Sequence, residues 1–558
     1  MTKTYYFPCL FILLFVFQCT TPQQAEEQVV ANPPVKDVFD WRNATVYFLL
    51  TDRFNNGQPS NDVNFGRDRE TALLRGFEGG DIVGITQKIE EGYFDRLGVN
   101  TIWFTPVVEQ IHGATDEGTG LTYGYHGYWA KDWTALDPNF GTMQELATLV
   151  ETAHEHGIRI LLDVVANHTG PVTIQDPAWP DAWVRVDPTC TYEGYESTVE
   201  CTLVENLPDI HTGKQTQVDL PARLLEKWEA EGRLEQEMDE LDAFFERTGY
   251  PRAPKYYLIK WLTDYVRELG VDGFRVDTAK HTEAEIWAEL KKEALAALRA
   301  WKEANPAMKL DDNPFWMVGE VYNYSAGSGQ PFDYGDTTVN FYNHGFESLI
   351  NFDFKYDAQK NYEAIFAKYD TLLHGGLLDG VNIMNYLSSH DDGAPFDPIR
   401  VRSEEAANKL LLAQGAAQIY YGDESDRTLV VPGSVGDATL RSFMNWDDIQ
   451  QNDSVQQVLE HWGKLGRFRN EHLAVGAGRH LTLATMPYTF ARTYNMNGVQ
   501  DKVVIALDAL AGEKELIVKE VFEDGTRLTD AYSGQEGIVA FGKVTINSPY
   551  SVVLLSAR

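Results

Sequence analysis

The feature of this sequence that most restricts its fold is a regular alternation of short apolar runs with amphipathic stretches, beginning near residue 38. The runs are apolar nearly throughout, as expected of parallel strands covered on both faces. They span residues 44–50, 99–106, 158–165, 271–277, 315–321, 349–354, 381–388 and 416–422. Stretches with helical periodicity occupy residues 86–98, 142–157, 256–270, 282–306, 361–375, 403–415 and 455–472, and the link between the fifth and sixth runs is the least clearly helical. Eight such units predict an α/β fold, a (β/α)8 barrel.

Two parts of the chain depart from this alternation. About 90 residues, from roughly 167 to 256, separate the third run from its helix, and a connection of that length is expected to form a small domain. After residue 472 the pattern changes to short strands at 481–486, 503–509, 514–521, 544–548 and 551–556, which predict an all-β domain of sandwich type. We therefore expect a leader and tether over 1–37, a barrel over 38–166 and 257–471, an inserted domain over 167–256, and a C-terminal domain over 472–558.

The N-terminal residues have the pattern of an export signal. Lys3 precedes an apolar run at residues 7–17, which is too short to span a bilayer comfortably, and Cys19 follows it before a polar stretch. This pattern resembles a bacterial lipoprotein signal with Cys19 as the lipidated residue; plain cleavage is the alternative. We expect an exported protein, in the periplasm or on the cell surface, with a lipid anchor to the bacterial outer membrane.

Two further observations bear on compartment and partners. Cys190 and Cys201 lie in one turn-rich stretch, and in an exported protein such a pair suggests a disulfide, with two reduced thiols as the alternative. The formal net charge is −36, which argues against nucleic-acid binding because that requires a basic surface. We expect no nucleic-acid partner and a monomer.

Titratable side chains gather where four of the predicted strands end, which in such a barrel is where active sites lie. These residues are Asp163, Asn167 and His168 in the third unit, Arg275, Asp277, Lys280 and His281 in the fourth, Glu320 in the fifth, and His390, Asp391 and Asp392 in the seventh. A surface loop that happens to be polar is the alternative for any one of these clusters. Three carboxylate-bearing strand ends in one barrel instead favour catalysis.

The chemistry that suits these residues is glycoside hydrolysis with retention, which uses one carboxylate as nucleophile and another as acid/base. Arg275 would hold Asp277 ionised, as a nucleophile must be. Glu320 has no cation beside it in the sequence, so we expect a raised pKa that suits an acid. Asp391 would stabilise positive charge on the sugar ring.

The four segments resemble the four signature regions of the α-amylase family, glycoside hydrolase family 13, and the resemblance extends from about residue 40 to the end. Residues 281–306, 315–321, 386–391 and 419–425 are similar to bacterial periplasmic α-amylases in particular. The resemblance implies cleavage of α-1,4-glucosidic bonds in starch, glycogen or maltodextrins. It implies Asp277 as nucleophile, Glu320 as acid/base and Asp391 as transition-state stabiliser, with the insertion as domain B and the tail as domain C.

The resemblance also implies substrate contacts. Those at the cleavage point are His126, Tyr128, His168, Arg275 and His390, and those on the leaving-group side are Lys280 and His281. Ser389 stands where many family members have Asn, which we expect to tune subsites. An α-glucan transglycosylase or cyclodextrin-processing enzyme would share this constellation. A non-catalytic glucan-binding protein is a more distant alternative, because such proteins usually lose a catalytic carboxylate.

Calcium is the cofactor that the resemblance implies, and it requires oxygen ligands. A structural site between domain B and the barrel would use Asn167, Asp209 and the backbone carbonyl of His281. A second group resembles an additional calcium loop of some relatives, and comprises Asn56, Gln58, Asn61, Asp62, Gly79 and Asp81. A polar turn without metal is the alternative for this second group.

Overall fold

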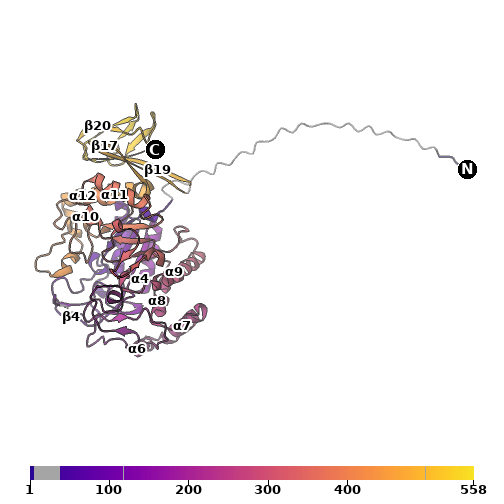
Figure 1. Ribbon diagram of the computed structural model, residues 1–558, viewed down its shortest axis with the longest axis vertical. Coiled ribbons are helices and arrows are strands. Elements are labelled where there is room, and N and C mark those ends of the chain that lie inside the picture. The colour runs from indigo at the N-terminus through magenta and orange to yellow at the C-terminus, as the bar shows by residue number, and fades with distance from the viewer. Residues whose placement is uncertain (5–37, 117, 497, 558) are drawn as a thin grey trace.

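The computed structural model of the chain describes residues 1–4, 38–116, 118–496 and 498–557 (Figure 1). The apolar run of the expected export signal and Cys19 lie outside the described residues. None of the helices within the described ranges is both long and apolar enough to span a membrane.

Eight parallel strands form a closed barrel in the order β1-β16-β15-β14-β11-β10-β7-β2. The strands are β1 (Thr45–Leu49), β2 (Thr101–Phe104), β7 (Arg159–Val164), β10 (Gly273–Val276), β11 (Trp316–Gly319), β14 (Ser348–Asn351), β15 (Asn382–Tyr386) and β16 (Ala416–Tyr420). Seven of them lie within one of the eight apolar runs, β14 begins one residue before its run, and each of the eight is buried along its whole length. The predicted (β/α)8 barrel is therefore confirmed.

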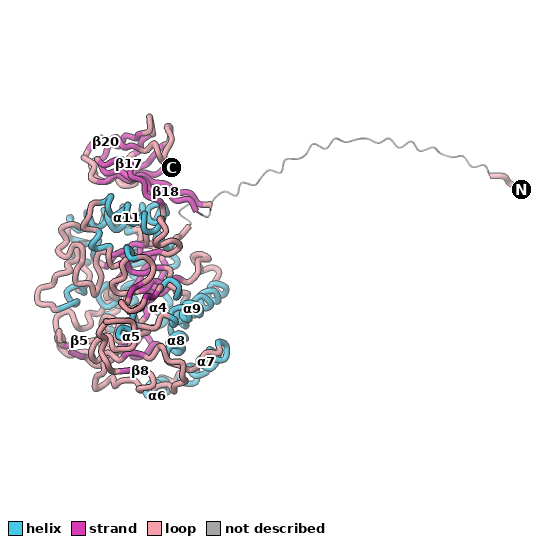
Figure 2. Tube along the Cα trace, in the orientation of Figure 1, coloured by secondary structure: helices cyan, strands magenta, loops and turns pink. Residues whose placement is uncertain are grey.

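Helices follow most of the barrel strands and cover them from outside (Figure 2). The longer ones are α2 (Ile82–Glu90), α4 (Met143–Glu155), α8 (Pro254–Leu269), α9 (Glu285–Ala304), α11 (Tyr362–His374), α12 (Ser403–Leu411) and α14 (Asp453–Glu471). The short ones are α1 (Thr51–Phe54), α3 (Tyr93–Leu97), α10 (Phe354–Asp357), α13 (Trp446–Gln451) and α15 (Leu473–Ala477). Local sequence sets their ends: Thr142 and Glu145 form a capping box at the start of α4, and Gly270 ends α8 at a φ of 76°.

The link between β11 and β14 contains no α-helix among its residues, all of which are described, in agreement with its weak helical pattern. It contains instead the strands β12 (Phe332–Asp333) and β13 (Thr338–Val339) and the 3-10 helices η5 (Ala326–Ser328) and η6 (Phe341–His344). This link follows the strand end that carries Glu320.

Two excursions emerge from the carboxyl ends of the barrel strands. The one after β7 contains β8 (Val184–Arg185), α5 (Glu196–Val199), β9 (Asp209–Ile210), α6 (Ala222–Ala230) and α7 (Leu234–Thr248). The one after β2, which the sequence pattern did not reveal, contains β3 (Val108–Gln110), β4 (Thr115–Asp116), β5 (Leu121–Thr122) and β6 (Ala130–Leu136). Residues of both line a common cavity of about 710 Å3, so the two excursions pack together.

The C-terminal residues form a six-stranded antiparallel sheet, in the order β17-β18-β19-β24-β21-β22, and a separate two-stranded antiparallel sheet of β20 and β23. The strands are β17 (Arg479–Thr485), β18 (Tyr488–Met496), β19 (Val499–Leu507), β20 (Gly512–Ile517), β21 (Arg527–Asp530), β22 (Glu536–Ile538), β23 (Lys543–Ser548) and β24 (Val553–Ala557). The all-β prediction is confirmed, although β18, β21 and β22 were not among the predicted strands. Figure 1 shows this sheet at the end of the molecule opposite to α6 and α7.

Candidate active site

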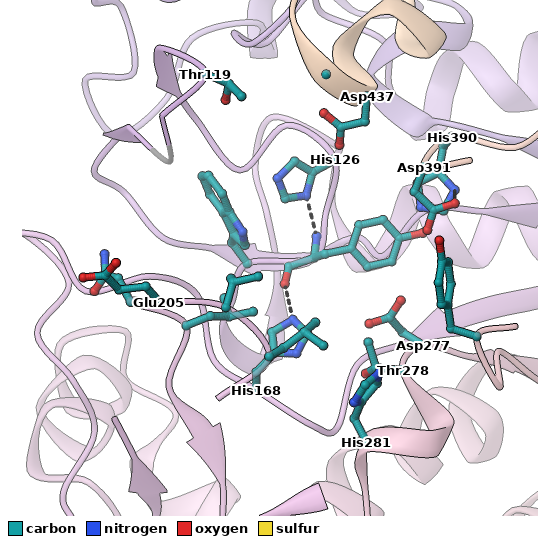
Figure 3. Close-up of a pocket in the computed structure, with 18 of the residues that line it drawn as sticks. Thr119, His126, His168, Glu205, Asp277, Thr278, His281, His390, Asp391 and Asp437 are labelled. Carbon is teal, nitrogen blue, oxygen red and sulfur yellow. Dashed lines mark hydrogen bonds and ion pairs between the residues drawn. The ribbon is translucent and has the colours of Figure 1, made fainter. Parts of the chain in front are cut away.

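The carboxyl ends of the barrel strands meet in a cavity of about 1310 Å3 (Figure 3). Both excursions contribute to its walls, together with the loops after β10, β11, β15 and β16. The structure brings these predicted site residues together in the lining: Asp277, Glu320, Asp391, His126, Tyr128, His168, Lys280, His281 and His390. Residues far apart in the sequence therefore share one site, as expected for strand ends of a barrel.

Arg275 is the electrostatic centre of the site. Its side chain is buried, with a relative exposure of 1%, and it contacts carboxylates from three neighbouring strands. One terminal nitrogen, Nη1, donates to Asp163 Oδ1 at 3.0 Å and to Asp277 Oδ1 at 2.8 Å. The other, Nη2, lies 3.1 Å from Glu320 Oε1. Burial alone would lower the pKa of Arg275, but these carboxylates outweigh it and raise the pKa well above its ordinary value.

The contact between Arg275 and Glu320 corrects one expectation from the sequence, because Glu320 does have a cation beside it. Its pKa is nevertheless raised well above the ordinary value. Burial is the largest cause, the charges of Asp277 and Asp391 add to it, and Arg275 opposes it. The pKa of Glu320 is therefore raised, as predicted. The cause is the burial of its carboxyl group and the nearby negative charges, not the lack of a cation. A carboxyl group kept protonated in this way can act as a general acid.

Asp163 is a second shared carboxylate, one layer below the cavity. It accepts hydrogen bonds from Trp103 Nε1 at 2.9 Å and from the hydroxyl of Tyr128 at 2.7 Å, in addition to those from Arg275. Burial raises its pKa to about 6, while Arg275 lowers it. Asp163 therefore orients both Arg275 and the half-buried ring of Tyr128 without lining the cavity itself.

The histidines of the site are neutral hydrogen-bonding groups, because burial lowers the pKa of His126, His168 and His390. The backbone N–H of Tyr128 donates to His126 Nδ1 at 3.1 Å, so the proton of that ring is on Nε2. His168 Nε2 lies 3.1 Å from the carbonyl of Tyr128, and His390 stacks on the Tyr128 ring with centroids 5.2 Å apart. Tyr128 thus contacts the imidazole rings of all three histidines, which line the same cavity as Asp277 and Glu320.

The loop after β16 supplies site residues that the sequence analysis missed. Arg441 is buried, lines the cavity, and donates from Nε to the carbonyl of His390 at 2.9 Å. Asp437 forms ion pairs with Arg441 and with Arg75, both of which also line the cavity. The only signal in the sequence for Arg441 and Asp437 is their position in the loop after the eighth strand.

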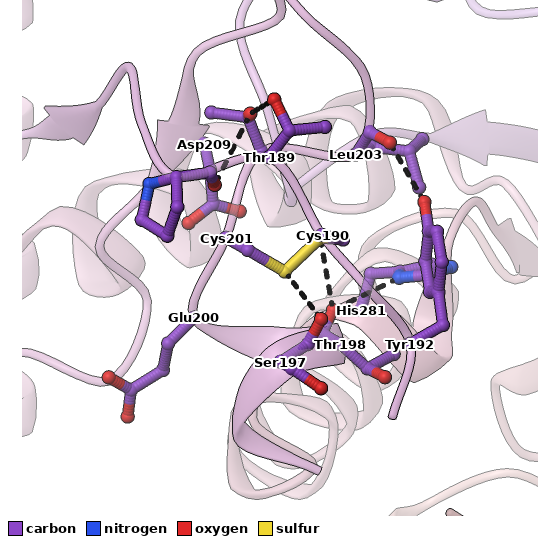
Figure 4. Close-up of a disulfide and its surroundings, with 12 residues drawn as sticks. Thr189, Cys190, Tyr192, Ser197, Thr198, Glu200, Cys201, Leu203, Asp209 and His281 are labelled. Carbon is purple, nitrogen blue, oxygen red and sulfur yellow. Dashed lines mark hydrogen bonds between the residues drawn. A yellow bond between two sulfur atoms is a disulfide. The ribbon is translucent and has the colours of Figure 1, made fainter. Parts of the chain in front are cut away.

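A disulfide bond between Cys190 and Cys201 closes a segment of the excursion after β7 (Figure 4). The short helix α5 forms the second half of this closed segment. The carbonyl of Thr198 in the segment lies 3.1 Å from His281 Nδ1, and since a carbonyl can only accept, Nδ1 carries the proton. The segment therefore contacts the loop that follows Asp277.

The first group of expected calcium ligands lies together. The backbone of Asp209 forms an isolated β-bridge with His168, the residue after Asn167. The hydroxyl of Thr282, the residue after His281, lies 3.4 Å from Asn167 Oδ1. Burial and the nearby charges of Glu283 and Glu200 raise the pKa of Asp209 to about 9, although Arg185 lowers it. Arg185 Nε contacts Asp209 Oδ2 at 2.9 Å but without hydrogen-bond alignment. A buried carboxylate with two further carboxylates near it, beside the side-chain oxygen of Asn167, is a donor set that suits calcium.

The second group also fits oxygen coordination. Asn56 Oδ1 and Asn61 Oδ1 are buried without hydrogen-bond partners, and Asn56 Nδ2 donates to Asp62 Oδ1 at 3.0 Å. Gly79 leaves a space there, since a Cβ at this position would collide with Asn56 and Asp62. Gln58 and Asp81 are tied together, because the backbone N–H of Gln58 donates to Asp81 Oδ2 at 2.8 Å. Within the described part of the chain, no group of three or more His, Cys, Asp or Glu side chains is placed to hold a metal, so amide and backbone oxygens would be needed at either site.

A closed parallel barrel with three carboxylates at its strand ends, two of them sharing one buried arginine, defines a barrel glycoside hydrolase. The chain belongs to the alpha-amylase family. The family model described as "Alpha amylase, catalytic domain" matches residues 48–194 and 235–472, more than half of the chain. This confirms the family resemblance seen in the sequence.

Individual relatives agree with this assignment. The chain is 38% identical over 525 residues to the periplasmic alpha-amylase of Escherichia coli (strain K12), covering 84% of this chain and 72% of that protein. It is 25% identical to a cyclomaltodextrin glucanotransferase of Thermoanaerobacterium thermosulfurigenes, over 87% of this chain and 62% of that enzyme. An Anoxybacillus alpha-amylase structure superposes with a TM-score of 0.65 at 22% identity, over 93% of this chain and 99% of that one, which supports the fold.

Proposed function

We propose that this protein hydrolyses α-1,4-glucosidic bonds in starch, glycogen or maltodextrins with retention of anomeric configuration. The observation that carries the proposal is the sharing of Arg275 between Asp277 and Glu320, with Glu320 the group whose pKa is raised. Two carboxyl groups held in different environments are suited to the two roles of a retaining glycosidase. The 38% identity to a periplasmic alpha-amylase supports the same substrate class.

In this proposal Asp277 attacks the anomeric carbon while Glu320 donates its proton to the leaving glycosidic oxygen. The resulting glycosyl-enzyme ester is then attacked by water, which gives its proton to the Glu320 carboxylate, and Asp277 is released. Asp391, whose side chain keeps a relative exposure of 35% at the cavity, would stabilise positive charge on the sugar ring. The neutral histidines and Tyr128 would hold the ring at the point of cleavage.

Transglycosylation or cyclodextrin processing is the second candidate, favoured by the identity to a cyclomaltodextrin glucanotransferase. The two activities share the first half of the reaction and differ in what attacks the ester. Hydrolysis remains the main proposal because the identity to an alpha-amylase is higher.

Calcium and export complete the proposal. A calcium ion held by Asn167, Asp209 and the carbonyl of His281 would fix the excursion after β7 against the nucleophile's strand end. A second ion would fit the group around Asn61.

We also propose that the protein is exported, as the periplasmic relative suggests, and anchored through Cys19. Mass spectrometry of the membrane fraction, with Cys19→Ser as control, would test the anchor.

A time course of products from maltoheptaose, followed by chromatography and by NMR of the newly formed anomers, tests the activity. We expect linear maltooligosaccharides that first appear as α-anomers. Cyclic products would favour the second candidate. No product at all, from a folded protein loaded with calcium, would contradict both enzymatic proposals.

A further inference from the structure

The loop after β15 carries Asp391 and, directly after it, Asp392, a second carboxylate that has no part in the proposed mechanism. Asp391 is weakly fixed by its own contacts. Its Oδ1 lies 3.5 Å from the hydroxyl of Ser389 and 3.7 Å from His390 Nδ1, at or beyond the limit of a hydrogen bond. The position of this carboxylate therefore depends on what holds the chain on either side of it.

On the side that precedes Asp391, the chain is held from the loop after β16, which is one neighbour of β15 in the barrel. Arg441 of that loop donates from Nε to the carbonyl of His390 at 2.9 Å. The guanidinium of Arg441 is itself paired with Asp437. The peptide group that precedes Asp391 is thus fixed by a buried arginine.

On the side that follows Asp391, the chain is held from the loop after β14, the other neighbour of β15. Lys355, on the short helix α10, forms an ion pair with Asp392 Oδ2. The hydroxyl of Tyr386 donates to the same oxygen at 2.6 Å, and the backbone N–H of Ala394 donates to Asp392 Oδ1 at 3.1 Å. Both oxygens of Asp392 therefore have partners, and the residue after Asp391 is fixed in place.

The pair of Lys355 and Asp392 is buried, since the two residues have relative exposures of 5% and 7%. Burial alone would raise the pKa of Asp392, but the hydrogen bonds and charge of its partners outweigh it and lower the pKa below its ordinary value. Asp392 is therefore an anion, and Lys355 is the cation that neutralises it beside Asp391. A buried ion pair contributes little net stability, because the desolvation of both ions offsets their attraction. What this pair provides is a defined position for the chain next to Asp391.

We propose that Lys355 is a positioning residue that, through Asp392, holds the carboxylate of Asp391 at the cavity, where it stabilises positive charge on the sugar ring. This inference rests on the proposed function. Asp391 is then held from both neighbouring strands, by Arg441 before it and by Lys355 after it. The sugar ring carries positive charge in the transition state but is neutral in the bound substrate, so displacement of Asp391 should affect the transition state more. The loss should therefore appear in kcat rather than in KM.

The first test removes the ammonium group. Lys355→Met keeps an unbranched side chain but leaves Asp392 without its cation. We expect kcat for maltoheptaose to fall about 100-fold, the loss expected when a catalytic group is displaced by about 1 Å, while KM stays within about twofold. Lys355→Arg keeps the charge and can still pair with a carboxylate, so it should retain far more of kcat than Lys355→Met.

The second test introduces the same change into an enzyme that already lacks the Asp391 carboxylate. The substrate is α-maltosyl fluoride, because fluoride leaves without protonation and keeps the residual rate of Asp391→Asn measurable. If Lys355 acts through Asp391, adding Lys355→Met to Asp391→Asn should change kcat by less than about twofold, although the same substitution is costly in the wild type. A role of Lys355 in the fold alone would lower kcat by the same factor in both backgrounds, and that result would overturn the proposal.

Lys260→Met is the matched control. Lys260 is buried to a similar extent, at 4% relative exposure, and forms ion pairs with Glu240 and Asp264. It lies on α8, which covers the barrel from outside, and it does not line the cavity. Lys260→Met should lower the melting temperature but leave kcat unchanged at a temperature where the variant is folded.

An unchanged kcat in folded Lys355→Met would also overturn the proposal. Should Lys355→Met not fold, Lys355→Gln, which keeps a hydrogen-bond donor without the charge, takes its place in both backgrounds, and the same comparison decides. Failure of the proposed function gives a different result, since the wild type itself would then release neither reducing sugar nor fluoride.

Discussion

Removing the guanidinium of Arg275 is the perturbation that most directly tests the electrostatics of the site. Arg275→Met keeps an unbranched side chain of related length but leaves Asp163, Asp277 and Glu320 without their shared cation. Arg275→Lys keeps the charge, but a single ammonium cannot reproduce contacts to three carboxylates from two forked nitrogens. The two variants therefore separate the charge from the geometry.

The expected magnitudes follow from the burial of the group. Breaking a buried ion pair by removing one partner costs about 3–5 kcal/mol of unfolding free energy, and Arg275 is 1% exposed. Loss of one preorganised electrostatic contact in an active site lowers kcat by about 100- to 1000-fold. Arg275 also lowers the pKa of Glu320, so its removal should raise that pKa further.

The sign of the pH effect is specific to the role of Glu320. If Glu320 acts as the acid, it must be protonated, and a higher pKa keeps it protonated to higher pH. The alkaline limb of the kcat/KM profile should therefore move to higher pH in Arg275→Met, and by less in Arg275→Lys. The assay is starch hydrolysis across pH at a temperature where each variant is folded.

Arg53→Met is the control for this experiment. Arg53 is also fully buried and pairs with Asp52, but it does not line the cavity. It should lose stability without moving the alkaline limb. An Arg275→Met enzyme with hydrolysis within tenfold of the wild type, or with an alkaline limb shifted to lower pH, would refute the shared-arginine argument.

The remaining predictions concern turnover, stability, metal and the disulfide. Asp277→Asn and Glu320→Gln should each lose at least about 10⁴-fold in kcat while remaining folded, and near-native activity in either would show that its role is misassigned. Glu320→Gln should also melt above the wild type at pH 7 but not at pH 4, as measured by thermal unfolding. Chelation should lower both melting temperature and activity, with calcium restoring both and Asp209→Ala mimicking the chelated state; an unchanged melting temperature with no metal by elemental analysis contradicts the calcium proposal. Alkylation without reductant should leave Cys190 and Cys201 unmodified in the intact mass, and two adducts there would exclude the disulfide in solution.

The barrel could be predicted because its strands are covered on both faces and therefore appear as continuous apolar runs. The positions of Asp277, Glu320 and Asp391 followed from the same reasoning, since the first two lie at the end of such a run and Asp391 lies three residues beyond one. The strands β18 and β21 of the C-terminal sheet were harder to recognise. β18 carries the polar residues Arg492 and Asn495 within its length, so local composition does not mark it as a strand.

The contacts that determine the chemistry could not be read from local sequence. Arg275 and Glu320 are 45 residues apart along the chain, and they meet only because β10 and β11 pair in register in the closed barrel. The same is true of Arg441, whose contact with His390 joins the loops after β16 and β15. Sequence reasoning identifies the groups at each strand end, but the pairing of strands decides which of them interact.

The raised pKa of Glu320 makes the stability of the folded protein depend on pH. Its pKa in the folded protein is raised, whereas in the unfolded chain it is near 4.3, about the model-peptide value. Between these two values the folded state binds more protons than the unfolded state, so the free energy of unfolding falls as pH rises through that window. Below the unfolded value both states are protonated and the residue contributes no pH dependence. Glutamine cannot ionise, so Glu320→Gln removes this destabilisation, and its advantage in melting temperature should be absent at pH 4 and grow above about pH 4.3. Asp163 contributes with the same sign but is present in both proteins, and it therefore cancels in the comparison. A difference in melting temperature that did not change with pH would show that the stability gained by the variant does not come from relieving a buried, ionisable acid.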